Sequence, residues 1–100
     1  RDMERLNLNR LLKIQEIAEC EVEICADNVT KELDTFNNEK YQNVVSFVEL
    51  RFGYWKTLTE EQIEQIQEIL NENHLKLELW WDDYDGDCGR KVSYRIIDKY

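Results

Sequence analysis

The chain has 100 residues, of which 42% are hydrophobic, and carries a formal net charge of -9. This composition suffices for one small folded domain over residues 1–100 and excludes an intrinsically disordered chain. No apolar stretch approaches the roughly 18 residues that a membrane-spanning helix needs. The net charge disfavours direct binding to nucleic acid or to an anionic membrane and favours a basic protein partner.

The acidic residues are concentrated in two blocks. Residues 16–39 hold eight acids against one lysine, and residues 57–88 hold ten acids against one lysine. The segments before, between and after these blocks are mildly basic. A surface with this distribution attracts cationic partners and repels phosphate backbones.

The first half of the chain lacks proline, and its first glycine is Gly53, which favours long elements. Apolar residues recur at spacings of three and four as far as Phe36 and predict one long helix over about residues 7–35. A competing interpretation ends this helix near Glu19. It makes the segment CEVEIC, residues 20–25, a strand, because apolar and acidic residues also alternate there.

Residues 44–52, VVSFVELRF, fit either a helix or a strand. Their apolar residues would line one helix face together with Tyr41 and Trp55. The segment is nevertheless rich in β-branched and aromatic residues, and Gly53 follows it directly. A C-terminal hairpin also needs a third strand or a covering helix to be stable. We therefore predict a strand over 44–52.

The clearest element is a helix from 60 to about 71. Thr59 is placed as its N-cap, with Gln62 at the third helical position to complete a capping box. Ile63, Ile66 and Leu70 lie on one face and predict the side that packs on the core.

The C-terminal segment alternates in two runs and predicts a β-hairpin. The first run has Leu75, Leu77, Leu79 and Trp81 on the core side, and the second has Val92, Tyr94 and Ile96. A two-residue type I′ turn at Asp85-Gly86 would pair Leu79 with Val92, Leu77 with Tyr94 and Leu75 with Ile96. The same alternation places Trp80 on the outer face, opposite Lys91. Trp80 then either packs over the side chains of Lys91 and Arg95 or serves as an exposed anchor for a partner.

Two metal sites can be considered, and the spacing opposes both. Asp83, Asp85 and Asp87 resemble the start of a calcium loop, but the glycine and glutamate that such a loop requires further on are missing. A weak cation site at this turn stays open. Zinc would need the three cysteines, Cys20, Cys25 and Cys88, with His74. The spacing between Cys20 and Cys25 directs them apart on either a helix or a strand. We therefore expect no metal and no cofactor.

The helix after Thr59 carries four glutamates, each four residues from the last: Glu60, Glu64, Glu68 and Glu72. Each step advances about 6 Å along the axis and about 40° around it, so the four form one ridge. Like charges at this spacing cost about 0.2–0.5 kcal/mol per pair, so the pattern is not tuned for stability alone. Spaced carboxylates on a rigid helix can imitate a phosphate backbone, although a solvated acidic face has the same composition.

The chain lacks the motifs of common enzymes. It has one histidine and two serines, and no nucleophile elbow, phosphate-binding glycine loop or zinc-protease motif. Three cysteines cannot all pair within one chain, which favours a reducing, cytoplasmic setting. A metal-dependent enzyme is therefore the least favoured class, and we expect a protein that is not an enzyme.

We predict an α+β fold: a long N-terminal helix, a strand, an amphipathic helix and a hairpin, with a three-stranded sheet against the helices. A parallel strand–helix–strand crossover through 44–82 would be right-handed. The function expected is that of a small acidic binding protein or nucleic-acid mimic that occupies a basic surface of a nuclease or another nucleic-acid-handling partner. Phage anti-defence inhibitors and immunity proteins are of this type. The expected contacts are Glu60, Glu64, Glu68, Glu72, Trp80, Asp82, Asp83, Asp85 and Asp87. The alternative is an accessory or homodimeric module that associates through the apolar face of the long helix around Val22, Val29 and Phe36.

Overall fold

A computed structural model of the chain describes residues 8–26, 29–33, 45–72 and 74–98. The fold is α+β, as the sequence predicts. In chain order its elements are α1 (Leu8–Ala18), β1 (Glu21–Ala26), β2 (Val29–Glu32), β3 (Val45–Arg51), α3 (Glu60–Asn71), β4 (Leu75–Asp85) and β5 (Gly89–Asp98).

The strands form one five-stranded sheet in the order β2-β1-β3-β5-β4, and every neighbouring pair is antiparallel. The prediction of three strands is therefore wrong in number. Both β3 and β4 run antiparallel to β5, which lies between them. The parallel crossover considered over 44–82 thus joins two strands that are not neighbours.

The long helix predicted over 7–35 is wrong, and the competing interpretation is confirmed. The helix α1 ends at Ala18, and Glu19 follows with a positive φ of 52°. Val22 and Ile24 are then buried on β1, because pairing with β3 buries an alternating face more completely than a lone helix would. The apolar helix face proposed for self-association does not exist. Val29 lies half-exposed on β2, and Phe36 is outside the described residues.

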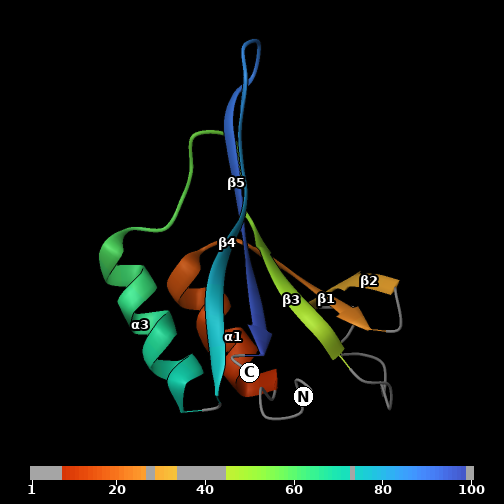
Figure 1. Cartoon of the computed structure of the whole chain (residues 1–100), viewed down its shortest axis with the longest axis vertical. Coiled ribbons are helices and arrows are strands. Elements are labelled where there is room, and N and C mark those ends of the chain that lie inside the picture. The colour runs from red at the N-terminus through yellow and green to blue at the C-terminus, as the bar shows by residue number, and fades with distance from the viewer. Residues whose placement is uncertain (1–7, 27–28, 34–44, 73, 99–100) are drawn as a thin grey trace.

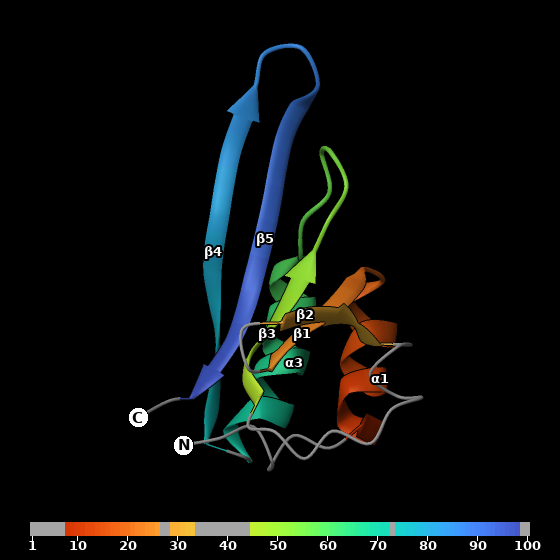
Figure 2. The same cartoon turned by 90° about the vertical axis from the view of Figure 1, so that its right-hand side faces the viewer.

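Both helices cover the same face of the sheet, as the two views at right angles show (Figures 1 and 2). The side-chain amide of Gln62 donates to the carbonyl of Ile17 at 3.0 Å and ties α3 to α1. The core between the layers contains fully buried residues from every layer, including Ile14, Leu50, Ile66, Leu70, Leu75 and Ile96. We call this the helix-covered face of the sheet and the other the open face.

The helix α3 begins and packs as its sequence predicts. The Thr59 hydroxyl accepts from the backbone N–H of Gln62 at 3.2 Å, and the Gln62 side chain accepts from the backbone N–H of Thr59 at 2.8 Å. Ile66 and Leu70 are fully buried, and Ile63 is partly buried beside them. This capping box fixes where the helix starts and therefore which side of it faces the solvent.

The hairpin has a different register from the predicted one. Leu79 pairs with Tyr94 and Leu77 with Ile96, which is a shift of two residues. A three-residue turn over 86–88, followed by Gly89 with a φ of 108°, replaces the two-residue type I′ turn. Because a shift of two preserves the alternation, Leu75 and Leu77 still face the core.

A β-bulge in β4 reverses the alternation beyond Leu79. The register changes between Leu79 and Trp81, so Trp80 is the extra residue. Trp81 pairs with Ser93 on the open face instead of facing the core, and Lys91 pairs with Asp83 instead of Trp80. The inserted residue moves Trp81 to the opposite face, whereas the predicted pair of Trp80 with Lys91 is already lost through the two-residue register shift.

The distal half of the hairpin projects beyond the rest of the molecule (Figures 1 and 2). The eleven residues of β4 extend over about 36 Å at the usual rise of a strand. The twelve residues of α3 cover only about 18 Å. The longest dimension of the molecule, 41 Å, follows the hairpin direction. We call residues 79–91, together with the adjoining loop residues 53–56, the arm.

The proximal half of β4 is an edge strand whose backbone is capped by a side chain. The Gln67 amide accepts from the N–H of Leu77 at 3.2 Å and donates to the carbonyl of Leu75 at 3.3 Å. A glutamine on α3 thus occupies the positions that a further strand would use.

Candidate partner-binding surface

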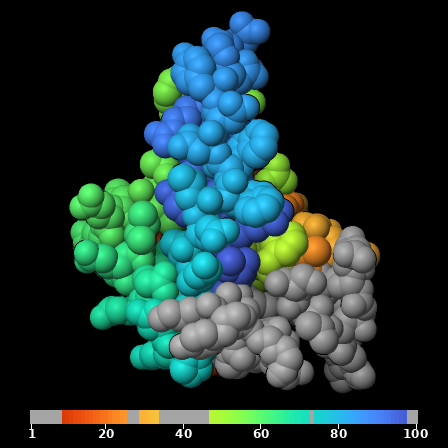
Figure 3. Space-filling view, viewed as in Figure 1, coloured from red at the N-terminus to blue at the C-terminus, as the bar shows by residue number. Residues whose placement is uncertain are grey.

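The arm concentrates the exposed apolar side chains of the described residues. Six of its large apolar side chains are exposed: Tyr54, Trp55, Leu79, Trp80, Trp81 and Tyr84. The distal half of the hairpin lies beyond both helices in the two ribbon views (Figures 1 and 2) and forms the upper part of the surface in the space-filling view (Figure 3). Aromatic side chains of this size contribute most at protein interfaces.

Trp55 is fixed at the arm by strained backbone and close packing. Its φ is 65°, which is unusual for a residue with a large side chain, and its N–H donates to the carbonyl of Arg90 at 2.8 Å. Its ring meets that of Tyr84 edge to face at 5.7 Å between centroids. A Cβ added to Gly89 would lie 2.3 Å from the indole nitrogen. The indole is nevertheless 66% exposed, so it is held in place while facing solvent.

Trp80 packs on Arg95, as one of the two interpretations of this residue expects. The guanidinium carbon of Arg95 lies 3.7 Å from the Trp80 ring centroid and 4.0 Å from that of Phe47, so the group is held between two rings. The Nε of Arg95 also donates to Glu49 at 3.0 Å. This arrangement fixes the orientation of Trp80 on the open face while about half of the residue stays accessible.

Trp81 has no such partner. It is 53% exposed on the open face, and no ring or cation among the described residues contacts its indole. The bulge at Trp80 thus produces two neighbouring tryptophans on one face, of which one is already stacked and the other is free to contact a ligand.

The aspartates of the arm differ in their surroundings. Arg90 donates from Nε and Nη2 to the two carboxylate oxygens of Asp82, both at 2.7 Å, and these bonds hold the pKa of Asp82 below its ordinary value. Asp83 and Asp85 accept from nearby backbone N–H groups at 2.9 Å. Asp83, Asp85 and Asp87 form no ion pair within the described parts of the chain. Three of the four arm carboxylates are therefore available to a cationic partner.

The glutamate ridge of α3 is exposed along its whole length. Glu60, Glu64, Glu68 and Glu72 all face solvent, and none forms an ion pair with another described residue. A shallow concavity of about 520 Å³ follows this surface, lined by Glu61, Glu64, Gln65, Gln67, Glu68 and Asn71. The ridge is thus an uncompensated row of carboxylates.

The ridge and the arm tip do not form one continuous surface. The helix α3 lies along the body, and its C-terminal end is at the opposite end of the long axis from the hairpin turn (Figure 1). Asp82 is moreover neutralised by Arg90. The structure therefore offers two separate acidic surfaces, of which only the arm combines carboxylates with aromatic side chains.

The cysteines and acidic residues form no metal centre in the described residues. No group of three histidine, cysteine, aspartate or glutamate side chains lies close enough there to hold an ion. Burial, and next to it the charge of Glu21, raises the pKa of Cys20 to about 12. This thiol is therefore protonated at neutral pH and unsuited to nucleophilic chemistry.

Several arm residues escape the sequence patterns. Tyr54 and Trp55 follow Gly53 in a loop, and Tyr84 lies among aspartates, so no periodicity marks them. The exposure of these residues could have been predicted from the relative lengths of the helix and the strand. An eleven-residue strand cannot be covered by a twelve-residue helix, so its distal side chains must be exposed.

The chain matches no protein-family model, no curated protein and no solved structure. Among the helices that the structure describes, none combines the length and the apolar character that crossing a membrane requires.

Proposed function

We propose that this chain is a small acidic binding protein that occupies a basic surface of a nucleic-acid-handling protein and inhibits it. Its arm inserts into the partner, with Trp81, Tyr84 and Trp55 as anchors and the tip aspartates around them. The exposure of these rings beside three unpaired carboxylates carries the proposal. Aromatic anchors surrounded by charge are the arrangement that contributes most binding energy at interfaces.

The glutamate ridge of α3 serves as a second contact. Because the ridge is separate from the arm, the partner is bound at two surfaces. The chain does not present one continuous row of carboxylates in place of a phosphate backbone. Long-range attraction between the ridge and a basic surface would increase the association rate, and the aromatic side chains would slow dissociation.

The proposal is tested with a partner isolated on the immobilised chain, repurified and titrated directly. Trp81→Ala with Tyr84→Ala should weaken binding at least tenfold at every salt concentration, mainly through faster dissociation. Glu64→Lys with Glu68→Lys should slow association and reduce its dependence on salt.

Glu16→Lys on α1 is the matched control, since Glu16 is exposed but lies on the other helix. Glu16→Lys should change the association rate and its dependence on salt less than Glu64→Lys alone or Glu68→Lys alone does. Binding that ignores both the arm substitutions and the salt concentration would refute the proposal.

A further inference from the structure

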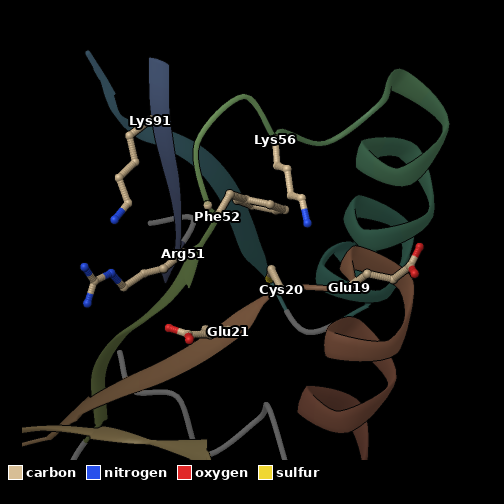
Figure 4. Close-up of a pocket in the computed structure, with 8 residues that line it drawn as sticks. Glu19, Cys20, Glu21, Arg51, Phe52, Lys56 and Lys91 are labelled. Atoms are coloured by element: carbon tan, nitrogen blue, oxygen red, sulfur yellow. The ribbon is translucent and has the colours of Figure 1, made fainter. Parts of the chain in front are cut away.

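Two concavities adjoin at the base of the arm. The first, of about 380 Å³, lies between the end of α1 and the loop that follows β3 (Figure 4). The second, of about 290 Å³, lies between β3 and the bulge of β4. Arg51 and Lys91 line both concavities, which are therefore neighbours on either side of these two side chains. Together they have a size suited to a small ligand.

The first concavity collects positive charge on an acidic chain. Arg51, Lys56 and Lys91 line it; in Figure 4 the nitrogens of Arg51 and Lys91 lie on one side of Phe52 and that of Lys56 on the other. The Glu19 carboxylate points away, and the Glu21 carboxylate lies on the side of Arg51. Arg51 is paired with Glu23 at 3.3 Å and with Glu49 at 3.9 Å. Lys56 and Lys91 form no ion pair with a carboxylate of the described residues.

The two lysines are therefore available to an anion, and Arg51, with five N–H donors, retains some beyond its two carboxylate partners. The Lys91 ammonium lies 5.2 Å from the centroid of the Tyr54 ring, which keeps its side chain at this opening. Gly53 lines the same concavity, and its missing side chain leaves open space there. The chemistry of this part suits phosphate or another compact polyanion.

The second concavity supplies an aromatic surface. Trp81 lines it with an indole that no described ring or cation contacts, whereas Trp80 beside it is stacked on Arg95. The hydroxyl-bearing Ser93 lies between β3 and Trp81 and is buried. An accessible indole next to a cationic concavity is suited to a planar heteroaromatic ring joined to phosphates.

We propose that these joined concavities bind a nucleoside phosphate, with the base stacked on Trp81 and the phosphates at Lys56, Lys91 and Arg51. A mononucleotide meets only the charges near the two concavities, which are lined by four cations and three carboxylates, with Glu23 paired to Arg51 as a fourth carboxylate. A nucleic-acid strand would continue over the other acidic surfaces of a chain with a net charge of -9. This site shares Trp81, Lys56 and Lys91 with the arm, but nucleotide binding is tested without the partner proposed above, so either proposal can fail alone.

The test is calorimetric titration of the whole chain with ATP, adenosine and pyrophosphate, without a divalent metal. ATP should bind about tenfold or more tightly than either fragment, because only ATP uses both concavities. In the NMR spectrum of the unaltered chain, ATP should shift the indole signal of Trp81 more than that of Trp55, which lies outside both concavities.

Lys56→Ala with Lys91→Ala should weaken ATP binding about tenfold or more and leave adenosine binding unchanged. Lys13→Ala, an exposed lysine on α1, is the control and should leave both unchanged. The proposal is overturned if millimolar ATP gives no heat and no indole shift, or if pyrophosphate binds as tightly as ATP. It is equally overturned if a single-stranded oligonucleotide displaces ATP at lower concentration than a mononucleotide does.

Discussion

Replacing Gly89 by alanine should destabilise the arm by driving Trp55 from its position. The added Cβ would lie 2.3 Å, 2.5 Å and 2.9 Å from three atoms of the Trp55 indole, all inside contact distance. Gly89 also has a φ of 108°, a conformation that alanine adopts only at a cost of about 1–3 kcal/mol. Loss of the edge-to-face contact with Tyr84 adds about 0.5–1.5 kcal/mol. The combined cost is about 1.5–4.5 kcal/mol.

Gly86→Ala is the matched control in the same turn. No atom lies within 4 Å of its added Cβ and its φ is not positive, so the cost should be about 0.5 kcal/mol or less. Urea unfolding, followed by circular dichroism and by tryptophan fluorescence, measures the free energy of unfolding of both variants. The NMR signal of the Trp55 indole N–H reports whether this ring is displaced. In a Trp55→Ala background the contact part of the Gly89→Ala cost should disappear, while the backbone part persists.

Equal stability of the two glycine variants would contradict this prediction, because both the close contact and the backbone strain are specific to Gly89. An unchanged Trp55 signal in Gly89→Ala would show that the indole does not lie over this glycine. The arm would then lack the packing that holds its most exposed aromatic residue.

Three further predictions concern the body and the arm. Because Arg90 lowers the pKa of Asp82, the contribution of this pair to folding is complete above the ordinary aspartate pKa and is lost as the pH falls through the lowered value. An NMR titration should therefore show the Asp82 midpoint rising in Arg90→Gln. Gln67→Ala should cost about 1–3 kcal/mol in urea unfolding, because it leaves two backbone groups of the edge strand without partners. A thiol reagent at mildly alkaline pH should modify the exposed Cys88 well before Cys20, whose pKa is about 12, and mass spectrometry of the digested protein reads the order.

The local signals in the sequence predict the body of the fold well. The capping box at Thr59 and Gln62 defines the start of α3, and the apolar spacing that ends at Leu70 defines its buried face. The strand over 44–52 is confirmed as β3, because β-branched and aromatic residues favour a pleated, partly buried surface. Each of these features depends on residues close together in the chain.

The wrong predictions concern features that depend on contacts between residues far apart in the chain. The segment around Val22 satisfies both a helical and an alternating period, and only its pairing with β3 selects the strand. The bulge at Trp80 depends on which residue of β5 each residue of β4 meets, so the alternation alone places Trp81 on the wrong face. The charges are visible in the sequence, but their division between α3 and the arm is set by the tertiary fold.

Hydrogen exchange of the chain, free and in complex with its purified basic partner, tests the arm as a binding surface most directly. Binding through the arm predicts that the strongest new protection falls on residues 79–91 and 53–56, with weaker protection along α3. It also predicts that Trp81→Ala with Tyr84→Ala removes the protection of the arm. New protection confined to β1, β2 and α1, with the arm exchanging as in the free chain, would contradict it.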